Sequence, residues 1–276
     1  MNFAGLAALL AAFLAGIATS AIAAEQPPTL VEIENPLAST HPLQGYLRRS
    51  NSTGPLPAVV LLHGCNGNWG HIDERWGRRI ASWGYVTLSV DSFGPRGLNN
   101  CGEGVRDDLT RDAYRALDFL VRDPFVDPAR VAVIGFAHGG RVALMSVERG
   151  LLEQTSPSKF HAAVAFYPPC LGFNGIMTAP TLILAGERDD WNLARECRNL
   201  VDGRDDWGIS RQKGEGFPMK LIVYPGAYHG FDAPALETPR QMSGHHLEFN
   251  QAATDQAAAA LREFLDATIG PQERPQ

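Results

Sequence analysis

The sequence predicts an α/β protein in which helices cover both faces of a mostly parallel β-sheet. Two patterns lead to this prediction. Short apolar runs bounded by Gly, Pro or Asp alternate with longer segments in which apolar residues recur every three or four positions. Such alternation is typical of parallel strands joined by right-handed crossovers. The chain of 276 residues is 45% hydrophobic and shows no linker or internal repeat, so we expect one domain with a large core.

The strands are expected where apolar residues form continuous runs. AVVLL, between Pro57 and His63, is typical of a strand that is buried on both faces. Runs of this kind are expected to form strands at residues 58–62, 85–90, 131–134, 162–166, 181–185 and 220–224. Ahead of them, residues 30–34 and 43–48 are expected to pair as short antiparallel strands.

The helices are expected where apolar residues recur on one helical face. Ile72, Trp76 and Ile80 mark the first helix, and Gly84 ends it. The expected helices cover residues 72–83, 109–120, 139–148 and 251–267. The segment 199–217 is polar and rich in glycine, so we interpret it as an exposed excursion between two strands and assign it no function.

The N-terminus has the composition of a secretory signal peptide. An uncharged stretch rich in Ala and Leu ends in small residues before the first charged side chain, Glu25. Ala21 and Ala23 fit the small-x-small cleavage pattern, so we expect a signal peptide at residues 1–23 and the mature domain at residues 24–276. An uncleaved membrane anchor is the alternative, because the stretch is nearly long enough to span a bilayer. Cleavage implies a periplasmic or secreted protein.

Charge and cysteine content narrow the possible functions. The formal net charge is −6, and Lys and Arg form no run, so nucleic acid is not expected as a partner. In an exported protein the four cysteines predict two disulfides, for which three pairings exist. No cysteine stands in a CxxC or Cys/His arrangement with metal-ligand spacing, so no metal centre is expected.

Polar, glycine-rich motifs follow four of the expected strands. In a parallel sheet the chemistry lies beyond the carboxyl ends of the strands. The motifs in those positions are HGCNG at 63–67, GFAHGG at 135–140, GERDDW at 186–191 and PGAYHGF at 225–231. In the second motif, small residues flank position 137 on both sides, as a sharp turn from strand to helix requires.

In this order the motifs resemble the dienelactone hydrolase family of the α/β-hydrolases, in its secreted branch. The phrases that carry the resemblance are LLHGCNG, VDSFGPRG, DPARVAVIGFAHGG, LILAGERDDW and YPGAYHGFD, and it extends from about residue 57 to the last helix. The resemblance implies hydrolysis of a small ester or lactone through an acyl-enzyme, without a cofactor or metal. It implies a small-molecule substrate and no obligatory protein partner.

The resemblance also assigns roles to individual residues. His229 is expected to be the general base, and Asp189 the acid that orients it, with Asp190 as the second choice. The backbone N–H groups of Cys65 and His138 are expected to form the oxyanion hole.

The sequence departs from the family at the nucleophile, because Ala137 stands where the family has Ser or Cys. A methyl group cannot attack a carbonyl, so hydrolysis should be abolished or severely reduced. Three explanations are open: a native Ser or Cys was exchanged for alanine, a natural relative lost ester hydrolysis, or another nucleophile substitutes. Cys65 is the nearest substitute, provided that it is a free thiolate. The alternative function is a non-catalytic protein of the cell envelope that binds a small ligand.

Two further side chains are weak candidates for contact with a substrate. By resemblance to a loop arginine of the family, Arg96 is a candidate to hold an anionic substrate, and the alternative is an arginine bonded to backbone or to Asp91. Trp191 is a candidate to cover the acid or to form a wall of the pocket.

The remaining histidines near the motifs have structural interpretations. The ring of His63 is expected to bond to backbone and fix its loop. His245 and His246 are interpreted as surface or capping residues rather than metal ligands, because Glu248 is the only carboxylate close to them in sequence.

The predicted fold indicates a disulfide pairing. Cys65 and Cys101 fall on neighbouring loops at the end of the sheet that carries the site, so we expect them to be bonded. Cys170 follows the strand that neighbours the one leading to Cys197, which predicts the second disulfide. A disulfide at Cys65 would exclude this residue as the substitute nucleophile.

Overall fold

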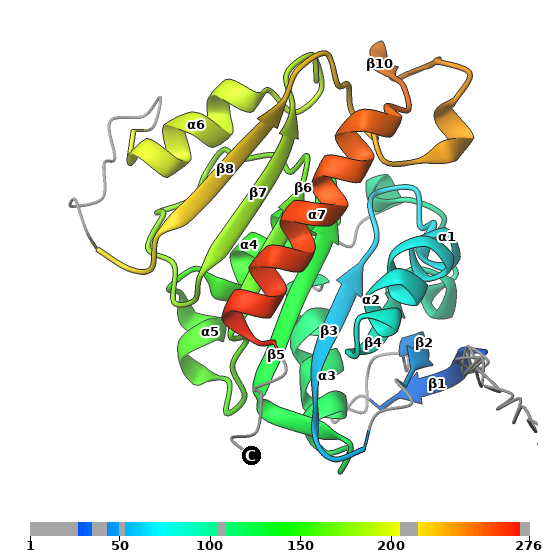
Figure 1. Ribbon diagram of the computed structural model, residues 1–276, viewed down its shortest axis with the longest axis vertical. Helices are drawn as coiled ribbons and strands as arrows, with labels where there is room; N and C mark the ends of the chain where they lie inside the picture. The colour runs from blue at the N-terminus through cyan, green and yellow to red at the C-terminus, as the bar shows by residue number, and fades with distance from the viewer. Residues whose placement is uncertain (1–26, 35–42, 50–52, 104–108, 205–214, 271–276) are drawn as a thin grey trace, which may run out of the picture.

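The computed structural model of the chain describes residues 27–34, 43–49, 53–103, 109–204 and 215–270 (Figure 1). The predicted signal peptide, with its cleavage point, lies outside the described residues. In the described part of the chain, no helix combines the length and apolar character that a membrane crossing requires.

The described strands form one large sheet that is parallel except at one edge. Its strands are β1 (Thr29–Ile33), β2 (Leu43–Arg48), β3 (Leu56–Leu62), β4 (Val86–Asp91), β5 (Val126–Phe136), β6 (Ala162–Phe166), β7 (Thr181–Gly186) and β8 (Met219–Tyr224). Their order across the sheet is β1-β2-β4-β3-β5-β6-β7-β8. β2 pairs antiparallel with β1 and β4, and the strands from β3 onward run parallel. The expected fold class and the antiparallel first pair are confirmed.

Helices cover both faces of this sheet. They are α1 (Trp69–Ile72), the π-helical turn η1 (Asp73–Gly77), α2 (Arg78–Ser82), α3 (Leu109–Val121), α4 (His138–Val147), α5 (Leu151–Thr155), α6 (Ala194–Asp202) and α7 (Gln251–Thr268), with 3-10 turns η2 (Gly94–Arg96), η3 (Cys101–Glu103) and η4 (Pro234–Leu236). α3 and α4 pack on one face, and α7 packs on the other together with the α1–α2 segment. Figure 1 shows α7 in front of the sheet and α3 and α4 behind it.

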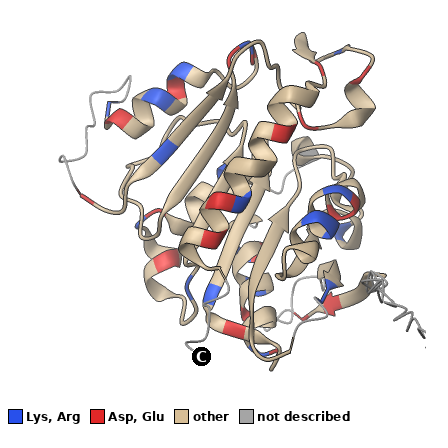
Figure 2. Ribbon diagram, viewed as in Figure 1, with Lys and Arg blue, Asp and Glu red and all other residues tan. Residues whose placement is uncertain are grey.

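The strand β3 contributes to both apolar layers. All of its residues are buried. Val60 and Leu62 pack in the layer of α3 and α4, while Val59 and Leu61 pack in the layer of α7, because successive side chains of a strand point to opposite faces. Figure 2 shows Lys, Arg, Asp and Glu mostly on the helices and at the sheet edges and strand ends, and the inner strands β6 and β7 contain none of them.

The sequence interpretation was wrong for the start of the segment 199–217. Residues up to Asp202 belong to α6 and are helical rather than an exposed excursion. The reason is tertiary packing, because Cys197 and Leu200 are buried against the sheet. Residues 205–214 of this segment lie outside the described residues.

Candidate active site

Ala137 occupies a strained turn between β5 and α4. Its φ is 51° and its ψ is −114°, which is rare for a residue other than glycine. Two glycines permit the turn: a Cβ at Gly135 would stand 1.9 Å from the carbonyl oxygen of Gly139, and one at Gly139 would stand 2.4 Å from that of Leu62. The N–H of Ala137 donates to the carbonyl of Phe166 (2.9 Å). This is the sharp turn from strand to helix that the motif predicts.

Asp189 and His229 meet beyond the carboxyl ends of β7 and β8. Nδ1 of His229 lies 2.9 Å from Oδ2 of Asp189, and both side chains are buried. The other oxygen, Oδ1, accepts the backbone N–H groups of Trp191 and Asn192, so the carboxylate is fixed on both sides. With the Nδ1 proton donated to Asp189, Nε2 is the imidazole atom left to accept a proton.

The two loops that carry this pair pack together because Gly186 has no side chain. A Cβ at Gly186 would stand 2.5 Å from the carbonyl oxygen of Ala227. The N–H of Arg188 donates to the same carbonyl (2.8 Å). The acid and the imidazole are therefore carried by loops that are bonded directly to each other.

The loop after β3 lies against the Ala137 turn. A Cβ at Gly64 would stand 3.4 Å from the Cβ of Ala137. His63 fixes this loop, because its Nδ1 donates to the carbonyl of Gly64 (2.8 Å) and its Nε2 accepts the N–H of Ser92 (3.1 Å). Burial lowers the pKa of His63, which favours the neutral ring that this bonding requires. The structural role predicted for His63 is confirmed, and Cys65 follows in the same loop.

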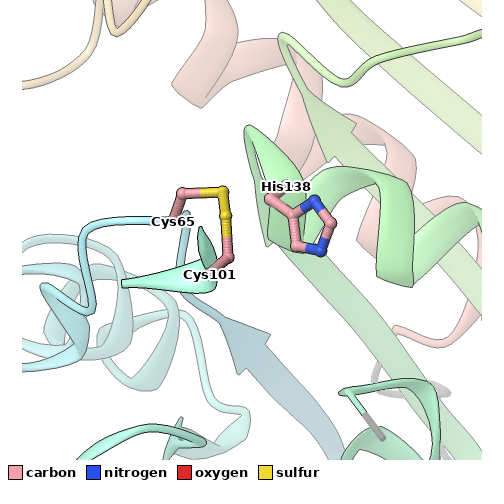
Figure 3. Close-up of side chains that lie close together, drawn as sticks. All are labelled: Cys65, Cys101 and His138. Atoms are coloured by element: carbon pink, nitrogen blue, oxygen red, sulfur yellow. A yellow bond between two sulfur atoms is a disulfide. The ribbon is translucent and has the colours of Figure 1, made fainter. Parts of the chain in front are cut away.

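Both disulfides are present in the predicted pairing. Cys65 is bonded to Cys101 and Cys170 to Cys197, with a Cα–Cα distance of 4.9 Å in each pair. Figure 3 shows the first disulfide beside His138, and a ring nitrogen and the two sulfurs lie within 4.8 Å of one another. Because these sulfurs are bonded to each other, neither is a thiolate that could bind a metal or attack a substrate. The structure therefore gives no support to Cys65 as the substitute nucleophile.

The guanidinium group of Arg96 is bonded to other residues of the protein. Its Nη1 and Nη2 donate to the carboxylate of Asp112 (2.6 and 2.8 Å), and Nη1 also donates to the carbonyl of Ser92 (2.6 Å). This is the bonded alternative, with Asp112 as the partner in place of Asp91. A role in holding an anionic substrate stays a prediction that these contacts do not support.

Two aromatic side chains pack against the imidazole of His229. Trp191 lies 5.2 Å from it between ring centroids, and its indole also stacks on His245 at 4.9 Å. Tyr167 meets the imidazole edge to face at 4.7 Å. Sequence analysis singled out Trp191 but missed Tyr167. Tyr167 directly follows β6, so the rule that chemistry lies at the carboxyl ends of strands could have found it.

A short hairpin that was not predicted stands beside the loop that follows β7 and carries Asp189 and Asp190, here called the acid loop. Its strands are β9 (Arg240–Met242) and β10 (His245–Leu247). Ser243 and Gly244 form its turn with positive φ, and this Ser-Gly pair was the available signal. The carboxylate of Asp190 accepts the N–H of His246 (3.1 Å), so the second-choice acid is engaged away from His229. Asn250, not a histidine, caps α7.

Comparison with known proteins defines first the class and then the family. A dienelactone hydrolase-like promiscuous phosphotriesterase from metagenomic libraries matches the structure with a TM-score of 0.69 at 22% identity, covering 89% of this chain and 100% of its own. The fold is therefore that of the α/β-hydrolases. The sequence model of the dienelactone hydrolase family matches residues 43–269, so the chain belongs to this family.

Two relatives found by sequence comparison have similar identity to this chain. An uncharacterised protein of Mycobacterium tuberculosis is 29% identical over 205 residues, which are 68% of this chain and 68% of that protein. A Bradyrhizobium protein, named a probable 2-oxo-3-(5-oxofuran-2-ylidene)propanoate lactonase, is 26% identical over 207 residues, covering 67% of this chain and 77% of its own.

Proposed function

We propose that this chain is a dienelactone hydrolase-like hydrolase of small esters or lactones, with a nucleophile-His-Asp site in which Ala137 replaces the nucleophile. Membership in the dienelactone hydrolase family supports this ligand class, and the Bradyrhizobium relative is named as a lactonase. The observation that carries the proposal is the backbone of Ala137, which keeps its φ of 51°. A strained turn of this kind costs about 1–3 kcal/mol, yet alanine derives no reactivity from it.

The surrounding groups supply every other part of acyl transfer. With Ser or Cys at position 137, Nε2 of His229 takes the proton of the nucleophile, which attacks the carbonyl carbon of the ester. Asp189, at 2.9 Å from Nδ1, then stabilises the imidazolium. The backbone N–H groups of Cys65 and His138 are assigned to the developing oxyanion. Collapse of the tetrahedral intermediate expels the alcohol, which takes its proton from His229.

Ala137 blocks this sequence at its first step. Without a nucleophilic side chain, the remaining route is attack by a water molecule that His229 deprotonates. Oxyanion stabilisation and binding alone leave roughly 10³- to 10⁴-fold acceleration over water. The protein with Ala137 therefore binds its ligand and hydrolyses it slowly at most.

The alternative is a protein that uses this site only to bind a small ligand. Ala137 favours this alternative, because its methyl group provides no atom that could attack a bound ester. For either function we propose a periplasmic or secreted protein. The predicted signal peptide and the two disulfides support this location.

Restoring the nucleophile separates the two functions. The experiment measures hydrolysis of p-nitrophenyl acetate and butyrate by the mature chain, by Ala137→Ser and by Ala137→Cys, each with and without His229→Ala. We expect hydrolysis to appear with the restored nucleophile and to vanish with His229→Ala.

Each other result has a defined meaning. Substantial His229-dependent hydrolysis by the chain as written would contradict the blocked step. If no form hydrolyses these esters while the chain still binds them in equilibrium titration, the binding protein is the better description.

A further inference from the structure

Tyr167 is in contact with strand β7 and with the loops that carry Asp189 and His229. Its N–H donates to the carbonyl of Leu184 in β7 (2.6 Å), and its carbonyl accepts from Nδ2 of Asn192, in the loop that follows Asp189 (2.8 Å). Its ring meets His229 edge to face. Its φ is 39°, a region that residues other than glycine rarely adopt. A residue keeps such a backbone only where its surroundings enforce it.

The hydroxyl of Tyr167 is tied to a buried carboxylate. It donates to Oδ1 of Asp232 (2.6 Å), while Oδ2 of the same carboxylate accepts the indole N–H of Trp76 (2.7 Å). Nη1 of Arg75 lies 4.0 Å from Oδ2. Because both oxygens accept, Asp232 has the bonding pattern of an ionised carboxylate. Burial raises the pKa of Tyr167 well above its usual value, so the phenol remains a donor at neutral pH.

Asp232 links the loop of His229 to the helical segment that follows β3. It follows His229 by three residues in the same loop, whereas Arg75 and Trp76 belong to the π-helical turn η1. π-helical turns are frequent at functional sites. The bonds of Asp232 thus join the histidine loop, the end of β6 and the helix that follows the Gly64 loop.

We propose that Tyr167, held by Asp232, is a positioning residue that keeps the imidazole of His229 aligned for proton transfer. Asp189 holds the ring at Nδ1 through one hydrogen bond. The rings of Tyr167 and Trp191 pack against the imidazole, with centroids at 4.7 and 5.2 Å, and restrict its tilt further. Because the hydroxyl is tied to Asp232, the phenol ring cannot turn away from the imidazole. The inference rests on the proposed function, since alignment matters only for a histidine that transfers a proton.

The kinetic test uses Tyr167→Phe in the Ala137→Ser protein. This variant keeps the ring and loses the bond to Asp232. The matched control is Tyr85→Phe, which removes a similar bond, from the Tyr85 hydroxyl to Asp266 (2.8 Å), at the opposite end of the sheet. We expect Tyr167→Phe to lower kcat about tenfold with little change in KM, and Tyr85→Phe to change neither, because small misalignments act on the reaction step.

A second arm needs no hydrolysis. In the chain as written, the ring ¹⁵N and ¹H resonances of His229 are compared by NMR between the parent, Tyr167→Phe and Tyr85→Phe. We expect only Tyr167→Phe to shift them. Unchanged resonances and unchanged kcat in folded Tyr167→Phe would overturn the proposal. If the Ala137→Ser parent is inactive, the proposed function fails, while the NMR arm still decides whether Tyr167 positions the ring.

Discussion

The geometry of the Asp189–His229 pair and the geometry of the turn at Ala137, here called the nucleophile turn, are held in place by different interactions. On the acid–base side the reactive side chains themselves are bonded to each other, Asp189 to His229 at 2.9 Å. At the nucleophile turn the reactive side chain is absent, and only the backbone of Ala137 keeps the geometry. The glycines around the turn set that geometry. The difference teaches that this turn adopts its strained backbone with alanine at position 137, without a reactive side chain to place.

The largest expected effect tests whether both sides still fit together. In the Ala137→Ser protein, His229→Ala should lower kcat/KM for p-nitrophenyl acetate by on the order of 10⁴-fold, because nucleophile and base act as a unit. In the chain as written, the same substitution should have a far smaller effect. Equal effects in the two backgrounds would show that the restored hydroxyl does not meet the imidazole.

The next effect separates the two neighbouring carboxylates. In the Ala137→Ser protein, Asp189→Asn should lower kcat by roughly 10³-fold, because the amide no longer holds the imidazole tautomer or stabilises its charge. Asp190→Asn is the matched control, since its carboxylate bonds the N–H of His246 instead. Steady-state kinetics of the pair decides the assignment. A larger loss in Asp190→Asn would reverse it.

The third effect tests whether glycines set the nucleophile turn. Gly135→Ala should lower the free energy of unfolding by more than about 3 kcal/mol, because the new Cβ would stand 1.9 Å from the carbonyl oxygen of Gly139. Gly70→Ala is the control. A Cβ at Gly70 meets nothing within 4 Å, and its effect should stay within about 0.5 kcal/mol. Urea denaturation measures both, and equal values would contradict the account of the turn.

A fourth comparison contrasts the two disulfides. Replacing either pair by serines should cost about 3 kcal/mol of stability. Only the Cys65–Cys101 replacement should also lower kcat of the Ala137→Ser protein, about tenfold, because it frees the loop that carries the proposed oxyanion donor, the N–H of Cys65. Cys170 and Cys197 are buried in the core, so their replacement should leave kcat unchanged in the folded protein. The kinetics are measured well below the unfolding temperature of both variants. A loss of kcat only in the Cys170–Cys197 replacement would contradict this expectation.

The smallest effect concerns pH. Burial lowers the pKa of His63 below its ordinary value of 6.5, so the unfolded chain takes up this proton more readily than the folded one. The stability that depends on neutral His63 is therefore complete above about pH 6.5 and lost as the pH falls toward the lower pKa of the folded state. His63→Gln should flatten the decline of the urea midpoint over this range. The exposed control His71→Gln should not.

Sequence reasoning located the residues that follow strand ends and missed those defined by tertiary contact. The runs around Val59 and Ile183 predicted buried strands because their apolar pattern is continuous. Topology placed the motifs of Asp189 and His229 at strand ends, and the resemblance to the dienelactone hydrolase family singled out these two residues. Leu200 belongs to helix α6, which the sequence did not reveal because most residues around Leu200 are polar. Asp232 could not be recognised as a structural carboxylate, because its hydrogen-bond donor Trp76 lies 156 residues away in sequence. The strands of the β9–β10 hairpin have three residues each, which is too short for periodicity to reveal.

The contact between that hairpin and the acid loop provides a natural probe of the site's internal motion. The amide of His246 is bonded to Asp190, the immediate neighbour of Asp189, and Leu247 forms an isolated β-bridge with His229. Deuterium can replace the His246 amide proton only when this bond opens. Its exchange rate therefore reports how often the loop of Asp189 and Asp190 separates from the hairpin, and this measurement requires no catalytic activity.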